Sequence, residues 1–296
     1  MDNIRSGFAG IIGRPNVGKS TLMNALIGER IAITTAKPQT TRNRITGIKN
    51  VEGGQIIFVD TPGIHRARGK LNRSMVETAL GTLGDMDVIL YIVDASKKED
   101  SRDAIIMDAL SKASAPVILV INKIDLVRKE DLLVAIDELR GLYSFAEIVP
   151  LSALKNFNVD DLTRTVLPLL PEGTRFFPED LITDASERFL AAEMIREKLM
   201  ILTHEEIPYA AAVLIESFKE DEEKDIIRIK AVINVEKDSQ KGIIIGKGGS
   251  MLKKIGADAR LDMEKFFGTR IFLELFVRVM KNWSDDPNRL HEFGYL

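Results

Sequence analysis

Short apolar runs alternate with amphipathic segments over the first 170 residues. The apolar runs are rich in Ile and Val and nearly free of charge, which is typical of strands buried on both faces of a mostly parallel sheet. They are Phe8–Gly13, Gln55–Asp60, Val88–Ala95, Pro116–Lys123 and Glu147–Ala153. The helical patterns between them are Ser20–Ile27, Leu71–Leu83, Asp103–Lys112, Asp131–Leu142 and Val159–Leu170. This alternation predicts an α/β fold.

One pair of strands departs from the parallel pattern. Arg44–Val51 and Gln55–Asp60 are separated by a turn that contains Gly53 and Gly54. Such spacing indicates a hairpin, so we expect one antiparallel edge strand in an otherwise parallel, mixed sheet.

The rhythm changes after residue 170. Residues 171–184 contain two prolines and a glycine and interrupt the alternation. The segments after them predict the order helix, strand, strand, helix, helix, strand, and thus a second, α+β domain. Its clearest elements are a helix over Ala185–Leu202 and strands near Ala211–Phe218, Ile226–Val235 and Ile271–Lys281. We expect a first domain over 1–172, a linker over 173–184 and a second domain over 185–296.

Composition narrows the functional classes. The 296 residues contain no cysteine and three histidines, which excludes disulfides and thiolate metal sites. No run of 18 apolar residues or signal-peptide pattern is present, so we expect a cytoplasmic protein. The formal net charge is −3, so binding to nucleic acid has to depend on a local basic patch.

A phosphate-binding loop is predicted after the first apolar run. Residues 13–20, Gly-Arg-Pro-Asn-Val-Gly-Lys-Ser, match G-x-x-x-x-G-K-[ST] between a strand and a helix. Glycines let backbone amides turn inward around an anion, and the following helix points its positive end at that anion. We expect Lys19 to reach the β- and γ-phosphates and Ser20 to bind Mg²⁺. The expected phosphate-binding residues are Gly13, Asn16, Val17, Gly18, Lys19, Ser20, Thr21 and Gly63.

Three further motifs end strands at the same edge of the predicted sheet, where α/β proteins bind ligands. In residues 60–63, Asp-Thr-Pro-Gly, Asp60 is expected to hold Mg²⁺ through water. Residues 122–125 are Asn-Lys-Ile-Asp, whose last carboxylate can accept two N–H groups of guanine, a contact that adenine cannot supply. The backbone after Ser152 can donate to the guanine O6. The expected guanine-binding residues are Asn122, Lys123, Asp125, Ser152 and Ala153.

With these motifs, residues 5–170 resemble the translation-factor-type GTPases. The Pro-Asn-Val before Gly18 narrows this to the bacterial branch that includes Era, Der and the tRNA-modification GTPases. The resemblance implies that a threonine closes over Mg²⁺ in the GTP state; we favour Thr41 over Thr40, which makes Ser20, Thr41 and Asp60 the metal site. It also implies that Asn16 helps to hold a K⁺ ion that replaces an arginine finger. The expected switch residues are Gln39, Thr40, Thr41, Arg42, Asn43, Asp60, Thr61, Pro62, Gly63 and Ile64.

The group that orients the attacking water is the open question in the first domain. Ras-like enzymes use a glutamine after D-x-x-G, but Ile64 stands there and has no polar group. His65 follows, either as the missing group or as an incidental loop residue. The resemblance instead suggests slow hydrolysis stimulated by K⁺ and by a partner. An alternative is an RNA-binding module whose GTP site is mainly structural and only weakly hydrolytic.

The second domain carries a glycine loop of its own. Residues 246–249, Gly-Lys-Gly-Gly, follow an apolar Ile-Ile-Ile run, open a predicted helix and fit the G-x-x-G loop with which KH domains clamp single-stranded RNA. Between Lys237 and Lys254 there are five lysines and one acidic residue, whereas the turn over Glu216–Asp225 is acidic. The helix and strand order is similar to that of type II KH domains. The expected RNA-binding residues are Gly246, Lys247, Gly248, Gly249 and Lys253.

A P-loop GTPase domain followed by a type II KH domain is the architecture of the Era family, and the whole chain resembles it. This resemblance implies GTP and GDP with Mg²⁺, and K⁺ as a further cofactor. It also implies binding to the 3′ end of 16S rRNA and a role in assembly of the 30S ribosomal subunit. A monomer is expected, and the family adds peripheral association with the inner face of the cell membrane.

Overall fold

The structure is a computed structural model that describes residues 4–35, 37, 40–64, 69–97 and 103–295. Contacts within the chain divide it into two compact units. The first comprises Met1–Ala32, Pro38–Arg68 and Asn72–Asp184, and the second comprises Ile33–Lys37, Gly69–Leu71 and Ala185–Leu296. Among the described helices, none combines the length and the apolarity that crossing a bilayer requires.

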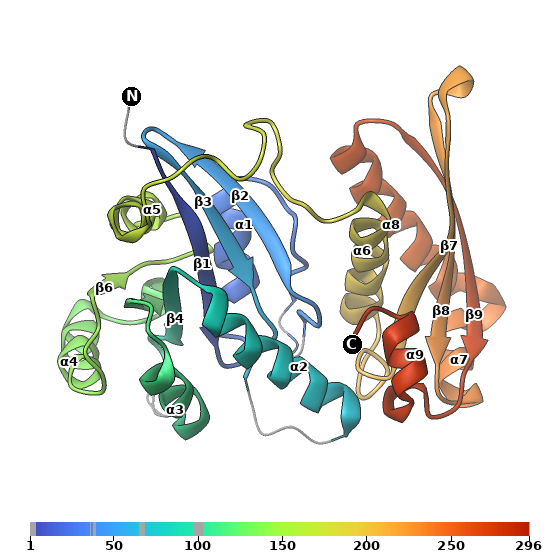
Figure 1. Cartoon of the computed structure of the whole chain (residues 1–296). Helices are drawn as coiled ribbons and strands as arrows, with labels where there is room; N and C mark the ends of the chain where they lie inside the picture. The colour runs from blue at the N-terminus through green and yellow to red at the C-terminus, as the bar shows by residue number, and fades with distance from the viewer. Residues whose placement is uncertain (1–3, 36, 38–39, 65–68, 98–102, 296) are drawn as a thin grey trace. The chain divides into compact units, whose positions relative to one another are not determined.

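A six-stranded sheet forms the centre of the first unit (Figure 1). Its strands lie in the order β2-β3-β1-β4-β5-β6, and every neighbouring pair is parallel except β2 and β3, so the predicted hairpin at the edge is confirmed. The mostly parallel mixed sheet is confirmed with it. The strands are β1 (Arg5–Gly13), β2 (Ile45–Val51), β3 (Gly54–Asp60), β4 (Val88–Asp94), β5 (Val117–Asn122) and β6 (Glu147–Pro150).

Helices cover both faces of this sheet, which explains why its strands are almost continuously apolar. The helix that follows the phosphate loop, α1, packs with α5 and with β1 to β3. Side chains of α2, α3 and α4 enter the core on the other face, where Ile12, Ile89 and Leu119 are fully buried. The helices are α1 (Lys19–Ile27), α2 (Lys70–Gly81), α3 (Ala104–Lys112), α4 (Lys129–Arg140) and α5 (Val159–Val166).

The segment predicted as a linker packs against the hairpin of the first unit. Gln55 is fully buried in β3 and receives the backbone N–H groups of Phe176 and Phe177 at 2.9 and 3.0 Å. Its amide nitrogen donates in turn to the carbonyl of Phe177 at 2.9 Å. Further along, the backbone N–H of Ile48 donates to the carbonyl of Ile182 at 2.8 Å. Residues 176–183 therefore lie along β2 and β3 as part of the first unit.

The second unit has the predicted order of helix, two strands, two helices and a strand, and this α+β KH arrangement is confirmed. Its three-stranded sheet has the order β7-β8-β9, with β7 antiparallel and β9 parallel to β8. Helices α6, α7 and α8 bury one face of the sheet. The elements are α6 (Glu187–Leu202), β7 (Ala211–Asp221), β8 (Ile226–Val235), α7 (Asp238–Ile245), α8 (Ser250–Phe267) and β9 (Arg270–Val279).

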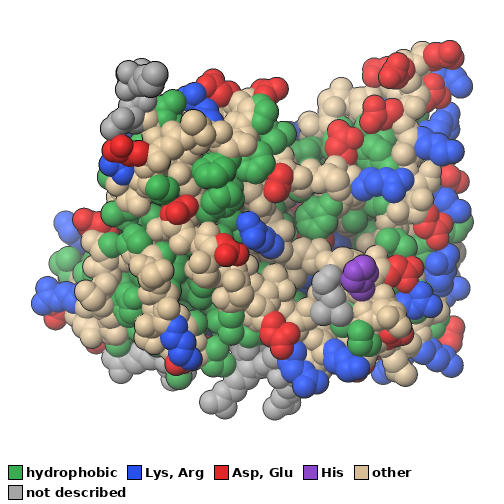
Figure 2. All heavy atoms as spheres, in the orientation of Figure 1, with side chains coloured by type: hydrophobic (Ala, Val, Ile, Leu, Met, Phe, Trp, Pro, Cys, Tyr) green, Lys and Arg blue, Asp and Glu red, His purple; other side chains and the backbone are tan. Residues whose placement is uncertain are grey.

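The other face of this sheet carries charged side chains. Figure 2 shows Lys and Arg side chains following one another along the right-hand edge of the view, over the strands of Figure 1, with acidic side chains between them. The alternation along β9 agrees, because its residues are exposed at every second position.

The chain after β9 folds into the same unit and was not predicted as an ordered element. Trp283 is fully buried, and its indole N–H donates to the carbonyl of Ala210 at 3.1 Å. Asp286 caps the short helix α9 (Pro287–Glu292) by accepting the backbone N–H of Asn288. An Asp-Pro pair is a helix-start signal, so the sequence did contain the information.

Candidate functional site

The phosphate loop joins β1 to α1 in a backbone conformation that depends on glycine. Gly18 has φ of +102°, and a Cβ there would lie 2.2 Å from the amide nitrogen of Asn122. Lys19 is buried, and its ammonium donates to the carbonyls of Gly13 and Arg14 at 3.1 and 3.0 Å. Val17 is buried below the loop, whereas Thr21 lies half-buried in the first turn of α1. The loop thus surrounds the point at which a phosphate would meet the start of α1.

Three oxygen-bearing side chains from three separate segments converge beside Lys19. The hydroxyl of Ser20 lies 2.7 Å from the hydroxyl of Thr41 and donates to Asp60 Oδ2 at 2.7 Å. The Thr41 hydroxyl donates to the same carboxylate oxygen at 3.1 Å. Thr41 is buried, whereas Thr40 is half-buried, which agrees with the choice of Thr41. The structure therefore brings together the three residues predicted to hold Mg²⁺.

The surroundings of Asp60 are suited to a divalent cation. It is fully buried, and its Oδ1 has no hydrogen-bond partner among the described residues. Burial raises the pKa of Asp60, while the charge of Lys19 and hydrogen bonds from Ser20 and Thr41 act in the opposite direction. A divalent cation favours the ionised carboxylate and uses such an oxygen. Mg²⁺ commonly takes one or two carboxylates together with substrate phosphates, so this set fits it.

The D-x-x-G segment is held against the phosphate loop. Thr61 is buried and donates to the carbonyl of Ile11 at 2.9 Å, and a Cβ at Gly63 would lie 2.8 Å from Pro15. Ile64 is fully buried in the core, where it packs with Ile12 and Val59. Its side chain thus has a packing role. Pro62 is buried, Arg42 and Asn43 lie just before β2, and Gln39 and His65 lie outside the described residues.

The guanine motifs come together at the carboxyl ends of β5 and β6. Asn122 is buried, and it donates to the carbonyl of Val17 at 2.8 Å while accepting the backbone N–H of Ala153 at 3.0 Å. Ser152 donates to the carboxylate of Asp125 at 2.5 Å. One Asn side chain therefore connects the phosphate loop with both base-reading segments.

The sequence analysis missed Asp94, which contacts Lys123 at this site. The Lys123 ammonium donates to the carbonyl of Asn16 at 2.6 Å and to Asp94 at 2.7 Å. Burial alone would raise the pKa of Asp94, but hydrogen bonds from Lys123 and Ser96 outweigh it and lower that pKa. Asp94 ends β4 at the same edge of the sheet, and this position was the signal that could have found it.

The predicted RNA loop of the second unit lies between α7 and α8. Its glycines have positive φ angles of 71° at Gly246, 60° at Gly248 and 79° at Gly249. A Cβ at Gly246 would lie 2.8 Å from Met251, whereas one at Gly248 or Gly249 would meet open space. Lys247 and Lys253 are exposed beside them. The loop is therefore accessible to a phosphate backbone and carries positive charge.

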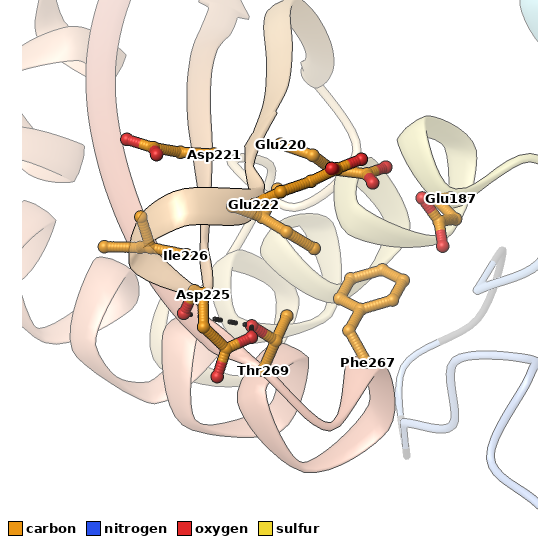
Figure 3. A pocket seen from close by; sticks show the side chains of 9 residues that line it. Glu187, Glu220, Asp221, Glu222, Asp225, Ile226, Phe267 and Thr269 are labelled. Carbon is orange, nitrogen blue, oxygen red and sulfur yellow. Dashed lines mark hydrogen bonds between the residues drawn. The ribbon is translucent and has the colours of Figure 1, made fainter.

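The acidic turn predicted in this unit forms a hollow of about 260 Å³ (Figure 3). Its carboxylates are those of Glu187, Glu220, Asp221, Glu222 and Asp225. Thr269 donates to the Asp225 carboxylate at 2.9 Å. Within the described residues, no group of His, Asp and Glu side chains is placed to hold a metal ion. The carboxylates of this hollow are unfavourable for phosphates, so we expect RNA to bind other parts of the unit.

Comparisons with known proteins find a match for each of the two units. The family model of 50S ribosome-binding GTPases matches residues 8–123, and the KH domain model matches residues 206–284. The chain is 59% identical over 291 residues to GTPase Era of Syntrophus aciditrophicus, covering 98% of this chain and 95% of the relative. It is 57% identical over 290 residues to GTPase Era of Geotalea daltonii, covering 98% and 97%.

Two solved structures are similar over nearly the whole chain. One is a variant of Aquifex aeolicus Era bound to GDP·AlF4⁻, with a TM-score of 0.94, 44% identity and 99% of each chain covered. The other is Era in complex with MgGDPNP and nucleotides 1506–1542 of 16S ribosomal RNA, also with a TM-score of 0.94, 44% identity and 99% of each chain covered.

Proposed function

We infer the function of this chain from the premise that it belongs to the Era family of GTPases. It binds GTP and GDP with Mg²⁺, hydrolyses GTP, and binds the 3′ region of 16S rRNA through its KH domain. One solved Era structure holds MgGDPNP together with that RNA, and another holds GDP·AlF4⁻. We infer that this chain binds the same kinds of ligand. Its role is to assist maturation of the 30S subunit as a switch that GTP hydrolysis resets.

The convergence of Ser20, Thr41 and Asp60 is the observation that carries the nucleotide-dependent part. Their hydrogen bonds lie next to the Lys19 ammonium, so a γ-phosphate with its Mg²⁺ would contact all four groups. Thr41 belongs to the segment between α1 and β2, whose position therefore depends on the nucleotide. This is the element through which the GTP and GDP states differ.

RNA binding tests the proposal directly. We would titrate an RNA of the sequence of nucleotides 1506–1542 in the Era complex against the full chain with a non-hydrolysable GTP analogue, and again with GDP. Tighter binding in the analogue state is expected. Equal affinities would contradict the switch.

The loop offers a matched pair of variants for the same titration. Gly248 has φ of +60°, which Asp and Asn tolerate better than other residues, and its Cβ position is open. Gly248→Asp adds a negative charge, and Gly248→Asn has the same shape without it. We expect the Asp variant to weaken RNA binding about tenfold or more relative to the Asn variant, through repulsion of phosphates. Equal affinities would place the RNA elsewhere.

Measuring the turnover of GTP distinguishes a hydrolytic site from the alternative, a mainly structural nucleotide site. Lys19→Ala removes the ammonium beside the phosphates and is expected to abolish multiple-turnover GTP hydrolysis. For the K⁺ ion we expect faster turnover in K⁺ than in Na⁺, a difference that Asn16→Ala removes. Equal turnover in the two salts would contradict the role of K⁺ and leave the rest of the proposed function unchanged.

Other expectations stand as proposals of the same kind. We place the domains at 1–172 and 185–296, joined by 173–184, and the contacts of residues 176–183 with β2 and β3 support counting the joining segment with the first domain. We also propose a monomer with peripheral association to the inner membrane. Sedimentation of the purified chain with and without anionic vesicles tests both.

A further inference from the structure

The face of the second unit's sheet that points away from its helices is unusual in its exposed rings. Ile271, Leu273, Leu275 and Val277 of β9 pack into the helix-covered core, so the residues between them face the opposite way. Phe272 and Phe276 lie on that opposite side and are 46% and 47% exposed. Phe272 and Phe276 are four positions apart along the strand, which places their Cα atoms about 13 Å apart.

Each exposed ring is accompanied by a cation from the neighbouring strand. The Arg228 guanidinium lies 5.4 Å from the centre of the Phe272 ring, and the Lys230 ammonium lies 5.1 Å from that of Phe276. Arg278 follows on β9. We call Arg228, Lys230, Phe272, Phe276 and Arg278 the outer sheet face.

Cations outnumber carboxylates on this face. By the alternation of the strands, Lys219 and Arg270 point to the same side, which gives five cations against the carboxylates of Asp221, Glu216 and Glu274. Glu216 holds two of the cations, with Arg278 at 2.9 Å and Lys230 at 3.4 Å. Phosphates complement such a surface, and flat bases complement the exposed rings between the charges.

The outer sheet face shares a hollow with α7, the helix that precedes the glycine loop. A hollow of about 310 Å³ is lined by Phe276, Arg278 and Lys230, and also by Lys241 of α7. Helix α7 ends at Ile245, directly before Gly246. Lys241 lies four residues before that end of α7, so a strand of RNA that follows α7 back from the loop to Lys241 would reach the ring of Phe276.

We propose, on the basis of the function proposed above, that the outer sheet face is a second RNA-binding surface, which takes single-stranded RNA leaving the Gly246–Gly249 loop. Bases stack on Phe272 and Phe276. Arg228 and Lys230, which the bases displace from the two rings, pair with the flanking phosphates. An acidic peptide would pair with the same cations but would need aromatic side chains at a matching spacing, whereas every RNA base has a flat face, so the rings favour RNA.

The experiment uses the full chain with GTP analogue and the 16S RNA probe of the previous section. Phe272→Ala combined with Phe276→Ala is expected to weaken binding by about fivefold or more for each ring. Leu261→Ala is the matched control, because Leu261 is 57% exposed on α8 and its loss should leave binding unchanged. Fluorescence of the buried Trp283, the single tryptophan, verifies that the second unit stays folded in each variant.

A substitution with the opposite sign separates an RNA surface from a merely structural one. Glu216→Gln removes the carboxylate that holds Lys230 and Arg278, so both become available to phosphates. Binding is expected to tighten about threefold or more, and the dependence of affinity on salt to steepen. A loss of affinity in this variant would contradict the proposal.

The outcomes distinguish this inference from the function on which it rests. If the double Phe variant binds as tightly as wild type while Gly248→Asp fails, RNA uses the loop alone and the outer sheet face is overturned. If wild type does not bind the probe, the proposed function is overturned as well. Losses in both variants support a path that runs over both surfaces.

Discussion

Lys19 has to be charged to hold phosphates, yet the fold buries it within the phosphate loop. Burial lowers the pKa of Lys19 from 10.5 to about 8, although the charge of Asp60 acts in the opposite direction. Because the folded-state pKa lies below the unfolded value, the unfolded chain binds more protons between about pH 8 and 10.5. The nucleotide-free protein should therefore gain stability as the pH rises through that window.

The same property predicts how nucleotide affinity depends on pH. Above its pKa Lys19 must take up a proton in order to pair with phosphates, so GDP affinity should fall about tenfold between about pH 7 and pH 9. Isothermal calorimetry in buffers of different ionisation enthalpy would measure both the affinity and the proton uptake. Lys19→Arg is the control, since it stays charged throughout and retains only the titration of other groups. Identical pH profiles for both proteins would contradict the assignment.

Among the elements, the segment that follows the first domain depends on one buried glutamine. Gln55→Leu keeps the volume but removes the hydrogen bonds to Phe176 and Phe177. The unmet backbone groups should cost about 1–3 kcal/mol, so the segment opens about fivefold more often or more. Trypsin cleavage after Arg175 should accelerate by that factor. Gln240→Leu, which changes a buried glutamine of the second unit, should leave this cleavage unchanged.

Element bounds show where sequence reasoning succeeds and fails. The strand Ile226–Val235 has the predicted bounds because every second residue from Ile227 to Val235 is apolar. The helix predicted over Val159–Leu170 ends at Val166, since Pro168 lacks the N–H that a continuing helix needs, and the chain turns into a short 3₁₀ helix. The strand from Ala211 extends to Asp221 because pairing with β8 continues through charged residues. Pairing depends on the neighbouring strand, which a local pattern does not contain.

The site divides in the same way. Motifs with fixed spacing, such as residues 13–20 and 122–125, predicted side chains that the structure brings to one edge of the sheet, because each motif positions its own side chains relative to one strand end. The contacts of Asp94 with Lys123 and of Gln55 with Phe177 join segments 29 and 122 residues apart. No spacing rule predicts such pairs, since they depend on which strands become neighbours.

For the molecule as a whole, the switch imposes a reciprocal relation between its two ligands. If the GTP analogue tightens RNA binding by some factor relative to GDP, then RNA must tighten analogue binding relative to GDP by the same factor. Competition between labelled GDP and the analogue, with and without the 16S RNA, measures the second factor. Factors that differ beyond error would mean that the two titrations observe different binding events. Gly248→Asp should remove the effect of RNA on the competition.

The position of Asn122 limits how this chain could be redesigned to accept an unnatural nucleotide. The same side chain accepts the N–H of Ala153 in a predicted guanine-binding segment and donates to Val17 in the phosphate loop, so altering it is expected to change base selectivity and triphosphate affinity together. Asp125 accepts a hydrogen bond from Ser152 and does not take part in the hydrogen bonds of Asn122 with Val17 and Ala153. A variant that binds a nucleotide with a synthetic base in preference to cellular GTP should therefore be made by substituting Asp125 and keeping Asn122.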